Sequence, residues 1–482
     1  MLPQRCLALV LAAVAASADA ADRWVAPGGD DATGTGAAGS PFRQIRRALQ
    51  GIAPGDTVHV ADGTYLGFDV TVSGTAGARI VVQGTGSNAV ITATTDRADN
   101  RDTIHLVAVS YVTIANLRSF NAPRSGLRVE AGNHVHVRGC TFGDNQRWGI
   151  FTGFSNDLVI EENECYGSVI EHGIYVSNSG DRPTVRGNRL HHNHANGLHV
   201  NGDRFTTSPP LPSEGIITGA LIERNVIWEN GAGGGSGINC DGVQDSVIRG
   251  NLVYAARSAG ITLYRIDGGG ASTGNRVIAN TVEVGAGGRW CLQLHNGADH
   301  TVVFDNILIS RHASRGSISL EGGTNGATIA SDHNILDATA ATDGSTFANL
   351  ATWQAQGHDA NSFVAARGDL FVDPDAGDYR LKAASPALDQ GISSFGGATA
   401  PTADLSDPAV ARPSGAAYDI GAYEGLASGS TPSGTTGGSS GTGTGGGTAG
   451  GSSGGGGGSC GLGGGGAIAV AGLVLLFARR RC

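Results

Sequence analysis

The chain has 482 residues, 79 of them glycine, and a formal net charge of −10. Charged residues make up 15% of it, whereas typical domains contain about 25%, and no basic patch is visible. Because proteins neutralise nucleic-acid phosphates with clustered Lys and Arg, this composition argues against a nucleic-acid partner.

The first twenty residues predict a secretory signal peptide. Arg5 supplies a positive charge, the apolar stretch "CLALVLAAVAAS" follows, and Ala18-Asp19-Ala20 gives a small-x-small cleavage site. The apolar stretch is too short to span a membrane comfortably. We therefore expect residues 1–20 to be removed and the protein to be exported, either to the cell surface and outer envelope or into the medium.

The next segment, residues 21–54, contains one candidate helix. In "SPFRQIRRALQGI" Ser40 would be the N-cap and Pro41 the first helical residue. The apolar side chains of this stretch would then share one helix face. They are Phe42, Ile45, Ala48, Leu49 and Ile52. We expect this amphipathic helix to cap the structure that follows it.

A short phrase recurs in the following part of the chain: an aliphatic residue, two variable residues and then Asn. Clear copies end at Asn163, Asn188, Asn225, Asn251 and Asn306, looser copies end at Asn116, Asn280 and Asn334, and Cys140 takes the same place in "VRGC". Most copies are 23 to 29 residues apart, and one step, from 188 to 225, is 37 residues long.

A second phrase, Gly-aliphatic-x-aliphatic, follows nine to twelve residues after each copy of the first. Its copies begin at Gly126, Gly149, Gly173, Gly197, Gly237 and Gly260, with looser ones at Cys291 and Ser317. Strands of this length cannot bury a face alone, so we expect stacked coils of about 25 residues in which each strand pairs with its neighbours above and below. Asn tolerates left-handed turns, and its amide can bond to the backbone or to the next Asn of the stack.

This pattern resembles the right-handed parallel β-helix superfamily, which includes pectate lyases, over residues 55–337. The phrase "GDTVHVADGTY" is similar to the start of the stack in that family. A leucine-rich repeat would show a fixed Leu pattern, and a propeller blade would need about 40 residues, so neither fits. The right hand comes from the family and from the crossover rule. The expected fold class is an all-β, right-handed parallel β-helix with an N-terminal capping helix.

Residues 338–424 contain "LFVDPDAGDYRLKAASPALDQG" and "ARPSGAAYDIGAYE", which resemble the C-terminal region of choice-of-anchor surface proteins. Asp373, Asp375 and Asp378 lie in this region. We interpret them as turn residues, with a calcium site as the alternative. Residues 425–459 are almost wholly Gly, Ser and Thr, which is the composition of a flexible linker.

The last segment, residues 460–482, reads "CGLGGGGAIAVAGLVLLFARRRC". Residues 461–478 carry no charge and are marginally long enough to span a membrane, with the terminal arginines on the cytoplasmic side. Together with Cys460 this segment resembles the myxobacterial-type Cys-containing C-terminal sorting tails, which are cut near the Cys so that the protein is attached to the surface. A simple tail anchor is the alternative. Both interpretations predict contact with the cell envelope.

Four cysteines lie in the repeat region: Cys140, Cys165, Cys240 and Cys291. They share no CxxC spacing, so we expect no zinc site. In an exported protein they could form a disulfide or remain free as small buried hydrophobic residues.

Two columns of outward-facing side chains follow from the second phrase, because the aliphatic residues of each strand point inward. The first column is Arg128, Phe151, Tyr175, His199, Asn239, Thr262, Gln293 and Ser319, and the second is Glu130, Gly153, Ser177, Asn201, Asp241, Tyr264, His295 and Glu321. Adjacent coils lie about 4.8 Å apart, so Tyr175 should neighbour His199 and Asn201 should neighbour Asp241. A slip of one residue would invert these assignments.

Two insertions, residues 203–218 and residues 265–274, leave the repeat at the ends of these strands. Long loops in a compact repeat are usually functional or disordered, and these two could wall a groove. The predicted groove residues are Tyr175, His199, Asn201, Asp203, Asn239, Asp241, Tyr264 and Arg265, with Arg147, Trp148, Glu171 and His172 on the opposite lip and His295 further along. Such a groove suits a polysaccharide, whose rings stack on aromatic side chains and whose hydroxyls bond to polar groups. We expect a monomer.

Three functions stay open for this groove. The only Lys of the chain is Lys382, so a lyase with a Lys base is disfavoured, whereas a His base with a Tyr acid could perform β-elimination or epimerisation beside a uronic-acid carboxyl. Predicted proximity gives these roles to His199 and Tyr175, with Asp241 as a third catalytic candidate. The alternatives are a non-catalytic carbohydrate-binding or structural surface protein and a glycoside hydrolase with paired carboxylates at Asp203 and Asp241. We expect no cofactor, with calcium left open.

Overall fold

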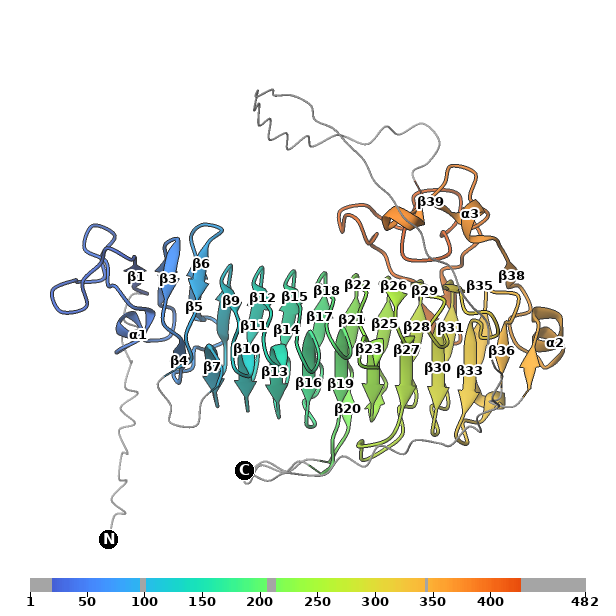
Figure 1. The fold of residues 1–482 in the computed structure, drawn as a ribbon, viewed down its shortest axis with the longest axis horizontal. Helices are drawn as coiled ribbons and strands as arrows, with labels where there is room; N and C mark the ends of the chain where they lie inside the picture. Colours follow the sequence, from blue (N-terminus) through green and yellow to red (C-terminus); the bar gives the residue numbers. More distant parts are fainter. Residues whose placement is uncertain (1–19, 96–100, 206–213, 343–345, 426–482) are drawn as a thin grey trace, which may run out of the picture. The chain divides into compact units, whose positions relative to one another are not determined.

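The computed structural model describes residues 20–95, 101–205, 214–342 and 346–425, and this part of the chain is built around three largely parallel β-sheets. Each sheet has twelve strands, and the coiling chain adds one strand to each sheet in turn (Figure 1).

Sheet 1 consists of β1 (Asp22–Val25), β2 (Thr57–Val60), β5 (Ile80–Gly84), β8 (Val112–Ala115), β11 (His136–Arg138), β14 (Val159–Glu161), β17 (Thr184–Arg186), β21 (Leu221–Glu223), β25 (Val247–Arg249), β28 (Arg276–Ile278), β31 (Val302–Phe304) and β34 (Ala330–Asp332). Sheet 2 consists of β4 (Phe68–Val70), β7 (Ile104–Val107), β10 (Ser125–Glu130), β13 (Trp148–Gly153), β16 (Ile174–Ser177), β19 (Leu198–Asn201), β23 (Ser236–Asp241), β27 (Ala259–Tyr264), β30 (Leu292–His295), β33 (Ile318–Glu321), β36 (Ala341–Thr342) and β37 (Phe347–Ala348). Sheet 3 consists of β3 (Gly63–Tyr65), β6 (Ala89–Ile91), β9 (Arg118–Phe120), β12 (Thr141–Gly143), β15 (Glu164–Tyr166), β18 (Arg189–His191), β22 (Val226–Trp228), β26 (Leu252–Ala256), β29 (Thr281–Val284), β32 (Ile307–Ser310), β35 (Ile335–Leu336) and β38 (Phe363–Val364).

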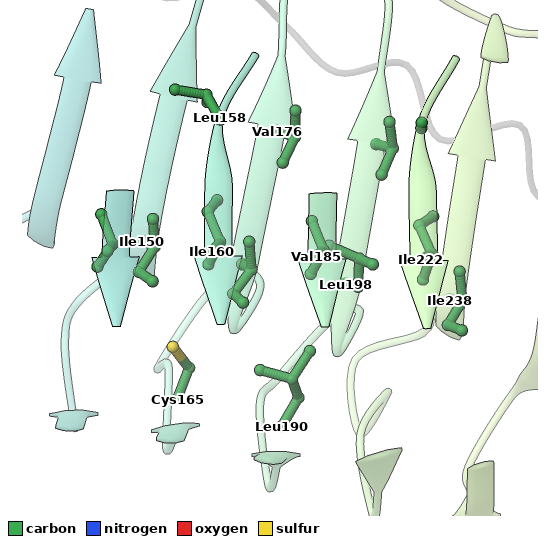
Figure 2. Close-up of a cluster of buried hydrophobic side chains, with 14 of the residues drawn as sticks. Ile150, Leu158, Ile160, Cys165, Val176, Val185, Leu190, Leu198, Ile222 and Ile238 are labelled. Atoms are coloured by element: carbon green, nitrogen blue, oxygen red, sulfur yellow. The ribbon is translucent and has the colours of Figure 1, made fainter. Parts of the chain in front are cut away.

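One continuous apolar core lies between the three sheets, because alternate side chains of each strand point inward. Figure 2 shows part of it, with Ile150, Val176, Leu198 and Ile238 from sheet 2, Ile160, Val185 and Ile222 from sheet 1, and Cys165 and Leu190 from sheet 3. The four cysteines of the repeat region are buried and unpaired, so they act as small hydrophobic residues. The predicted all-β parallel β-helix is confirmed.

The recurring glycine of the second phrase lies at the corner between sheets 3 and 2, where the chain passes close to core side chains. A Cβ atom on Gly197 would lie 2.6 Å from Cγ2 of Ile227, and one on Gly237 would lie 2.4 Å from Cγ1 of Val253. These separations are far shorter than van der Waals contact. Glycine therefore recurs because the corner has no room for a side chain.

The asparagines of the first phrase form a ladder of hydrogen bonds inside the coils. Both the main-chain N–H and the Nδ2 of Asn188 donate to Oδ1 of Asn225, each at 3.0 Å. The same pattern runs through Asn163, Asn188, Asn225, Asn251, Asn280, Asn306 and Asn334. The predicted bonding of each amide to the next Asn is confirmed.

The left-handed residue of this turn is not the ladder Asn itself, contrary to the prediction. It falls one position before the ladder Asn, for example at Gly187 (φ 63) and Arg224 (φ 53). Asn116 is itself left-handed (φ 53), and main-chain hydrogen bonds place Leu117 one coil before Cys140. Asn116 is therefore not a member of the ladder, and the apolar Leu117 occupies the equivalent position of its coil.

The predicted N-terminal helix is shorter than expected. It is the single turn α1 (Ile45–Ala48), so neither Ser40 nor Pro41 belongs to it. The reason is that Phe42 pairs with Val25 in a parallel bridge, which takes this part of the chain into sheet-like bonding.

The predicted apolar face of this segment is nevertheless correct. Phe42, Ile45, Ala48 and Ile52 are buried in the main core, and Leu49 packs against it. α1 contacts β1, β2 and β4 (Figure 1). The role of the helix as a cap stays a prediction.

Four further short elements lie between strands of the three sheets: β20 (Ile217–Thr218), which pairs with β24 (Val243–Gln244), η1 (Gly326–Thr328) and α2 (Leu350–Ala355). After the last strand of the sheets come α3 (Arg367–Leu370), η2 (Pro374–Ala376) and the antiparallel pairs β39 (Phe371–Asp373) with β40 (Asp378–Leu381) and β41 (Ser394–Phe395) with β42 (Ala398–Thr399). The three aspartates considered for calcium each have a nearby protein partner. Asp373 accepts the N–H of Ala376 at the start of η2, Asp375 pairs with Arg367 at 2.8 Å, and Asp378 pairs with Arg380.

The stacked strands extend beyond the predicted bounds of 55–337, since β1 already pairs with β2 and β38 still pairs with β35. Residues 1–19 of the signal peptide, the linker beyond Gly425 and the tail with Cys460 lie outside the described residues, and these segments stay predictions. Within the described ranges, no helix is both long and apolar enough to cross a membrane.

Candidate functional site

The outer face of sheet 2 carries both predicted columns in the predicted register. Tyr175 pairs with His199, His199 with Asn239, and Asn201 with Asp241 on adjacent strands. The first column continues without a break from Arg128 to Ser319. Side chains about two dozen positions apart are therefore neighbours, as the repeat predicts.

The rings of the first column stack on one another. The Arg128 guanidinium lies 4.2 Å from the Phe151 ring centroid, Phe151 and Tyr175 stack at 5.5 Å, and Tyr175 and His199 stack at 4.9 Å. Both faces of Phe151 and of Tyr175 are therefore covered by neighbours. The faces of Tyr175, one of the predicted groove residues, are therefore not open to a sugar ring, and only the edge of its ring is left for a ligand.

His199 of this stack and the neighbouring His172 form a chain of hydrogen bonds that fixes the positions of their ring protons. The main-chain N–H of Asn196 donates to Nδ1 of His172 at 3.1 Å, so the neutral His172 ring carries its proton on Nε2. That Nε2 lies 3.1 Å from Nδ1 of His199 and donates to it. The neutral His199 ring consequently carries its own proton on Nε2.

The position of these ring protons decides whether His199 can act as the predicted general base. Burial lowers the pKa of His199 to about 3 and lowers the pKa of His172 well below its usual value, so both rings are neutral at neutral pH. A general base needs an unprotonated nitrogen that faces the substrate. The unprotonated nitrogen of His199 is Nδ1, which faces His172, and its protonated Nε2 is buried, so the ring would have to change tautomer to act as a base.

The polar side chains next to Tyr175 hold one another and the start of the first loop. Nδ2 of Asn201 donates to the Tyr175 hydroxyl at 3.1 Å, and Oδ1 of Asn201 accepts the main-chain N–H of Asp203 at 3.0 Å. Asp203 accepts the main-chain N–H of Phe205 at 3.0 Å. Burial is the main cause that raises the pKa of Tyr175, so its hydroxyl keeps its proton at neutral pH.

Asp241 anchors the second loop. It is buried, and its two oxygens accept the main-chain N–H groups of Ile266, Asp267 and Gly268 at 2.9, 2.8 and 3.0 Å. Burial raises the pKa of this carboxyl, although the three main-chain bonds oppose the shift. A carboxylate whose oxygens are engaged in this way is poorly placed to attack a sugar or activate a water.

The two inserted loops leave from the ends of β19 and β27, as predicted, and they meet. The main-chain N–H of Arg204 donates to the carbonyl of Asp267 at 3.0 Å, and the N–H of Gly269 donates to the carbonyl of Gly215 at 2.6 Å. Arg265 turns back onto its own loop, where its Nε donates to the carbonyl of Gly268 at 3.3 Å.

The remaining predicted residues divide between the surface and the interior. Arg147 is exposed. Its guanidinium lies 5.3 Å from the Trp148 ring centroid and 3.8 Å from the Glu171 carboxylate. Trp148 is buried, and Asn239 is buried with its Nδ2 bonded to Oδ1 of Asn196 at 3.1 Å. Tyr264 is half-buried at the end of β27.

An open hollow lies further along the same face, at β30 and β33. Its volume is about 550 Å³, and its lining residues are Arg289, Trp290, Gln293, His295, Ser314, Arg315, Glu321 and Phe347. Of the predicted binding residues, only His295 lines it. Nε2 of His295 lies 3.1 Å from Oγ of Ser319, which in turn donates to Oε1 of Glu321 at 2.8 Å.

The sequence did contain a signal for this hollow. "RW" occurs twice at the start of a sheet 2 strand, as Arg147-Trp148, whose Trp is the first residue of β13, and as Arg289-Trp290, which ends two residues before β30 begins. The second copy precedes "CLQL", a looser copy of the phrase that lacks the leading glycine. Trp290 is buried and stacks on the exposed Phe347 with centroids 6.1 Å apart.

A metal site has no support among the side chains that the structure describes. No group of three or more His, Cys, Asp or Glu in those ranges is arranged to hold a metal ion.

The comparisons with known proteins identify the family. A family model described as "Right handed beta helix region" matches residues 53–209 and 168–333, so the chain belongs to the right-handed β-helix family. A second model, described only as a protein of unknown function, matches residues 27–69. No curated protein matches the chain.

The solved structures that are similar to this chain include two lyases. One is pectate lyase Pel9A, at 15% identity and a TM-score of 0.55, covering 84% of this chain and 96% of that one. The other is a rhamnogalacturonan lyase, at 12% identity and a TM-score of 0.50, covering 79% of this chain and 96% of that one. At these identities the likeness shows the shared fold.

Proposed function

We propose that this protein binds a polysaccharide along the outer face of sheet 2. The observation that carries the proposal is the open hollow of about 550 Å³ at β30 and β33. Its lining combines an exposed aromatic ring, Phe347, with the amide, imidazole and guanidinium groups that bond to sugar hydroxyls. The pectate and rhamnogalacturonan lyases named above support the same ligand class.

The expected export and surface attachment belong to this proposal. The signal-like residues 1–20 and the tail at 460–482 support them. A protein held at the cell surface would meet extracellular polysaccharides directly.

Binding is tested with the full-length protein by affinity electrophoresis in gels that contain polygalacturonate, alginate or neutral dextran. The substitution Phe347→Ala removes the exposed ring of the hollow, and Phe120→Ala, on sheet 3, is the matched control. We expect retardation in at least one acidic gel and a dissociation constant about tenfold higher for Phe347→Ala only. Unretarded migration in every gel would overturn the proposal.

A second candidate function is β-elimination or epimerisation by Tyr175 and His199. The pairing of these residues on adjacent strands favours it, and both are uncharged at neutral pH by the pKa shifts given above. Catalysis would require the proton of His199 to move from Nε2 to Nδ1, which would break the hydrogen bond from His172.

The same incubations separate catalysis from binding. Unsaturated uronic products, followed by ultraviolet absorbance, indicate a lyase, and retention without products indicates a binder. If the His199 role is correct, His199→Ala abolishes turnover while retention in the gel persists. Unchanged turnover in His199→Ala would reject that role.

A further inference from the structure

The hollow on sheet 2 carries more positive than negative charge, although the chain as a whole is acidic. Two guanidinium groups, those of Arg289 and Arg315, line it together with one carboxylate, that of Glu321. The net charge of the whole chain is −10. A local excess of positive charge in such a chain marks a place where an anion is stabilised.

The two guanidinium groups of the hollow are not paired with protein carboxylates in the described residues. Within the described residues neither Arg289 nor Arg315 has an ion pair, and the side chain of Arg315 makes one long hydrogen bond, 3.4 Å from NH1 to the carbonyl of Gly288. The corresponding residue of the other "RW" copy, Arg147, lies 3.8 Å from Glu171. Of the two "RW" arginines, Arg289 in the hollow is therefore the one whose guanidinium is not paired with a protein carboxylate in the part of the chain that the structure describes.

The single carboxylate of the hollow is partly occupied. Oε1 of Glu321 accepts the Ser319 hydroxyl at 2.8 Å, and Oε2 lies 3.8 Å from Nε2 of His295. Next to these charges lie the amide of Gln293 and the exposed ring of Phe347. Donors for an anion, partners for hydroxyls and an apolar surface thus meet in one hollow.

We propose that this hollow recognises the anionic group of an acidic sugar residue, a carboxylate or a sulfate, between Arg289 and Arg315. The sugar ring lies against Phe347, and its hydroxyls bond to Gln293 and Glu321. Guanidinium groups present paired N–H donors that match the oxygens of either anion. This inference rests on the proposed polysaccharide binding and adds the charge of the ligand and the position at which it is read.

The test compares polymers that share a backbone and differ in whether it carries anionic groups. Titration calorimetry of the full-length protein uses polygalacturonate and its fully methyl-esterified form, which has the same backbone without charge, and dextran sulfate against dextran. We expect an affinity at least tenfold higher for one acidic polymer than for its uncharged counterpart. Preference for polygalacturonate assigns a carboxylate as the ligand group, and preference for dextran sulfate assigns a sulfate.

The protein variants then locate the recognition. Arg289→Gln and Arg315→Gln should each weaken binding of the acidic polymer about tenfold and leave binding of its uncharged counterpart unchanged. Arg276→Gln is the matched control, because Arg276 begins β28 of sheet 1. Urea unfolding midpoints equal to that of the wild type exclude a folding defect in these variants.

The failures of the two proposals give different results. Equal affinity for the acidic and uncharged polymers, or equal weakening in Arg289→Gln and Arg276→Gln, would overturn the charge recognition and leave polysaccharide binding standing. Absence of binding to any of the four polymers and to alginate would overturn both.

Discussion

Substitution of Asn225 by Ala should destabilise the coils by removing one member of the ladder. Oδ1 of Asn225 accepts the N–H of Asn188 at 3.0 Å, and its Nδ2 donates to the Val185 carbonyl at 2.9 Å. In Asn225→Ala the buried N–H of Asn188 is left without this acceptor, which costs about 1–3 kcal/mol. The lost bond to the carbonyl adds about 1 kcal/mol, so we expect the free energy of unfolding to fall by about 2–4 kcal/mol.

Urea denaturation of the full-length protein, followed by circular dichroism, measures this change. The exposed Asn88 supplies the control, and Asn88→Ala should alter the free energy of unfolding by less than about 0.5 kcal/mol. If Asn225→Ala and Asn88→Ala unfolded at the same urea concentration, the ladder would contribute nothing to stability and the reasoning would be refuted.

Three further predictions concern the corner, a buried carboxyl and the hollow. Gly197→Ala should lower the free energy of unfolding by about 1–3 kcal/mol, because the new Cβ would lie 2.6 Å from Cγ2 of Ile227. Gly77→Ala places its Cβ in open space and should leave the free energy of unfolding unchanged in the same urea assay. Equal effects of the two substitutions would contradict the steric explanation. Burial raises the pKa of Asp305 to about 8, above its value of about 3.9 in the unfolded chain. The contribution of this carboxyl to stability is therefore present at acid pH and is lost as the pH rises through about 8. The free energy of unfolding should fall as the pH rises between these two pKa values, and less steeply in Asp305→Asn than in the wild type. Burial is the main cause that lowers the pKa of His295, with Arg289 acting in the same direction and Glu321 against it, so this ring gains its charge only below about pH 6.5. The affinity for dextran sulfate, measured by calorimetry, should therefore rise on acidification. A rise of equal size in His295→Gln would contradict the contribution of this ring.

The fold and the outward columns could be predicted because the repeat itself defines the register. Once "GIYV" and "GLHV" are taken as the same strand in successive coils, Tyr175 must neighbour His199, and the structure has this pairing. The alternation of inward aliphatic residues then fixes which side chains face outward. No long-range information is required, because every contact of this kind follows from a spacing of one coil.

What the outward side chains do with each other could not be read from the spacing. The rings of Phe151 and His199 cover the two faces of Tyr175, and three loop N–H groups engage Asp241. These contacts depend on rotamers and on loop conformations, neither of which is periodic. The hollow depends also on Phe347, which comes from β37 after the last clear repeat.

A crystal structure of the protein with a bound acidic trisaccharide, such as trigalacturonate, tests the central claim most directly. The account predicts that one carboxylate of the ligand lies within hydrogen-bond distance of Arg289 or Arg315 and that a sugar ring rests against Phe347. A trisaccharide seated over His199 and Asn239, with nothing bound in the hollow, would contradict it.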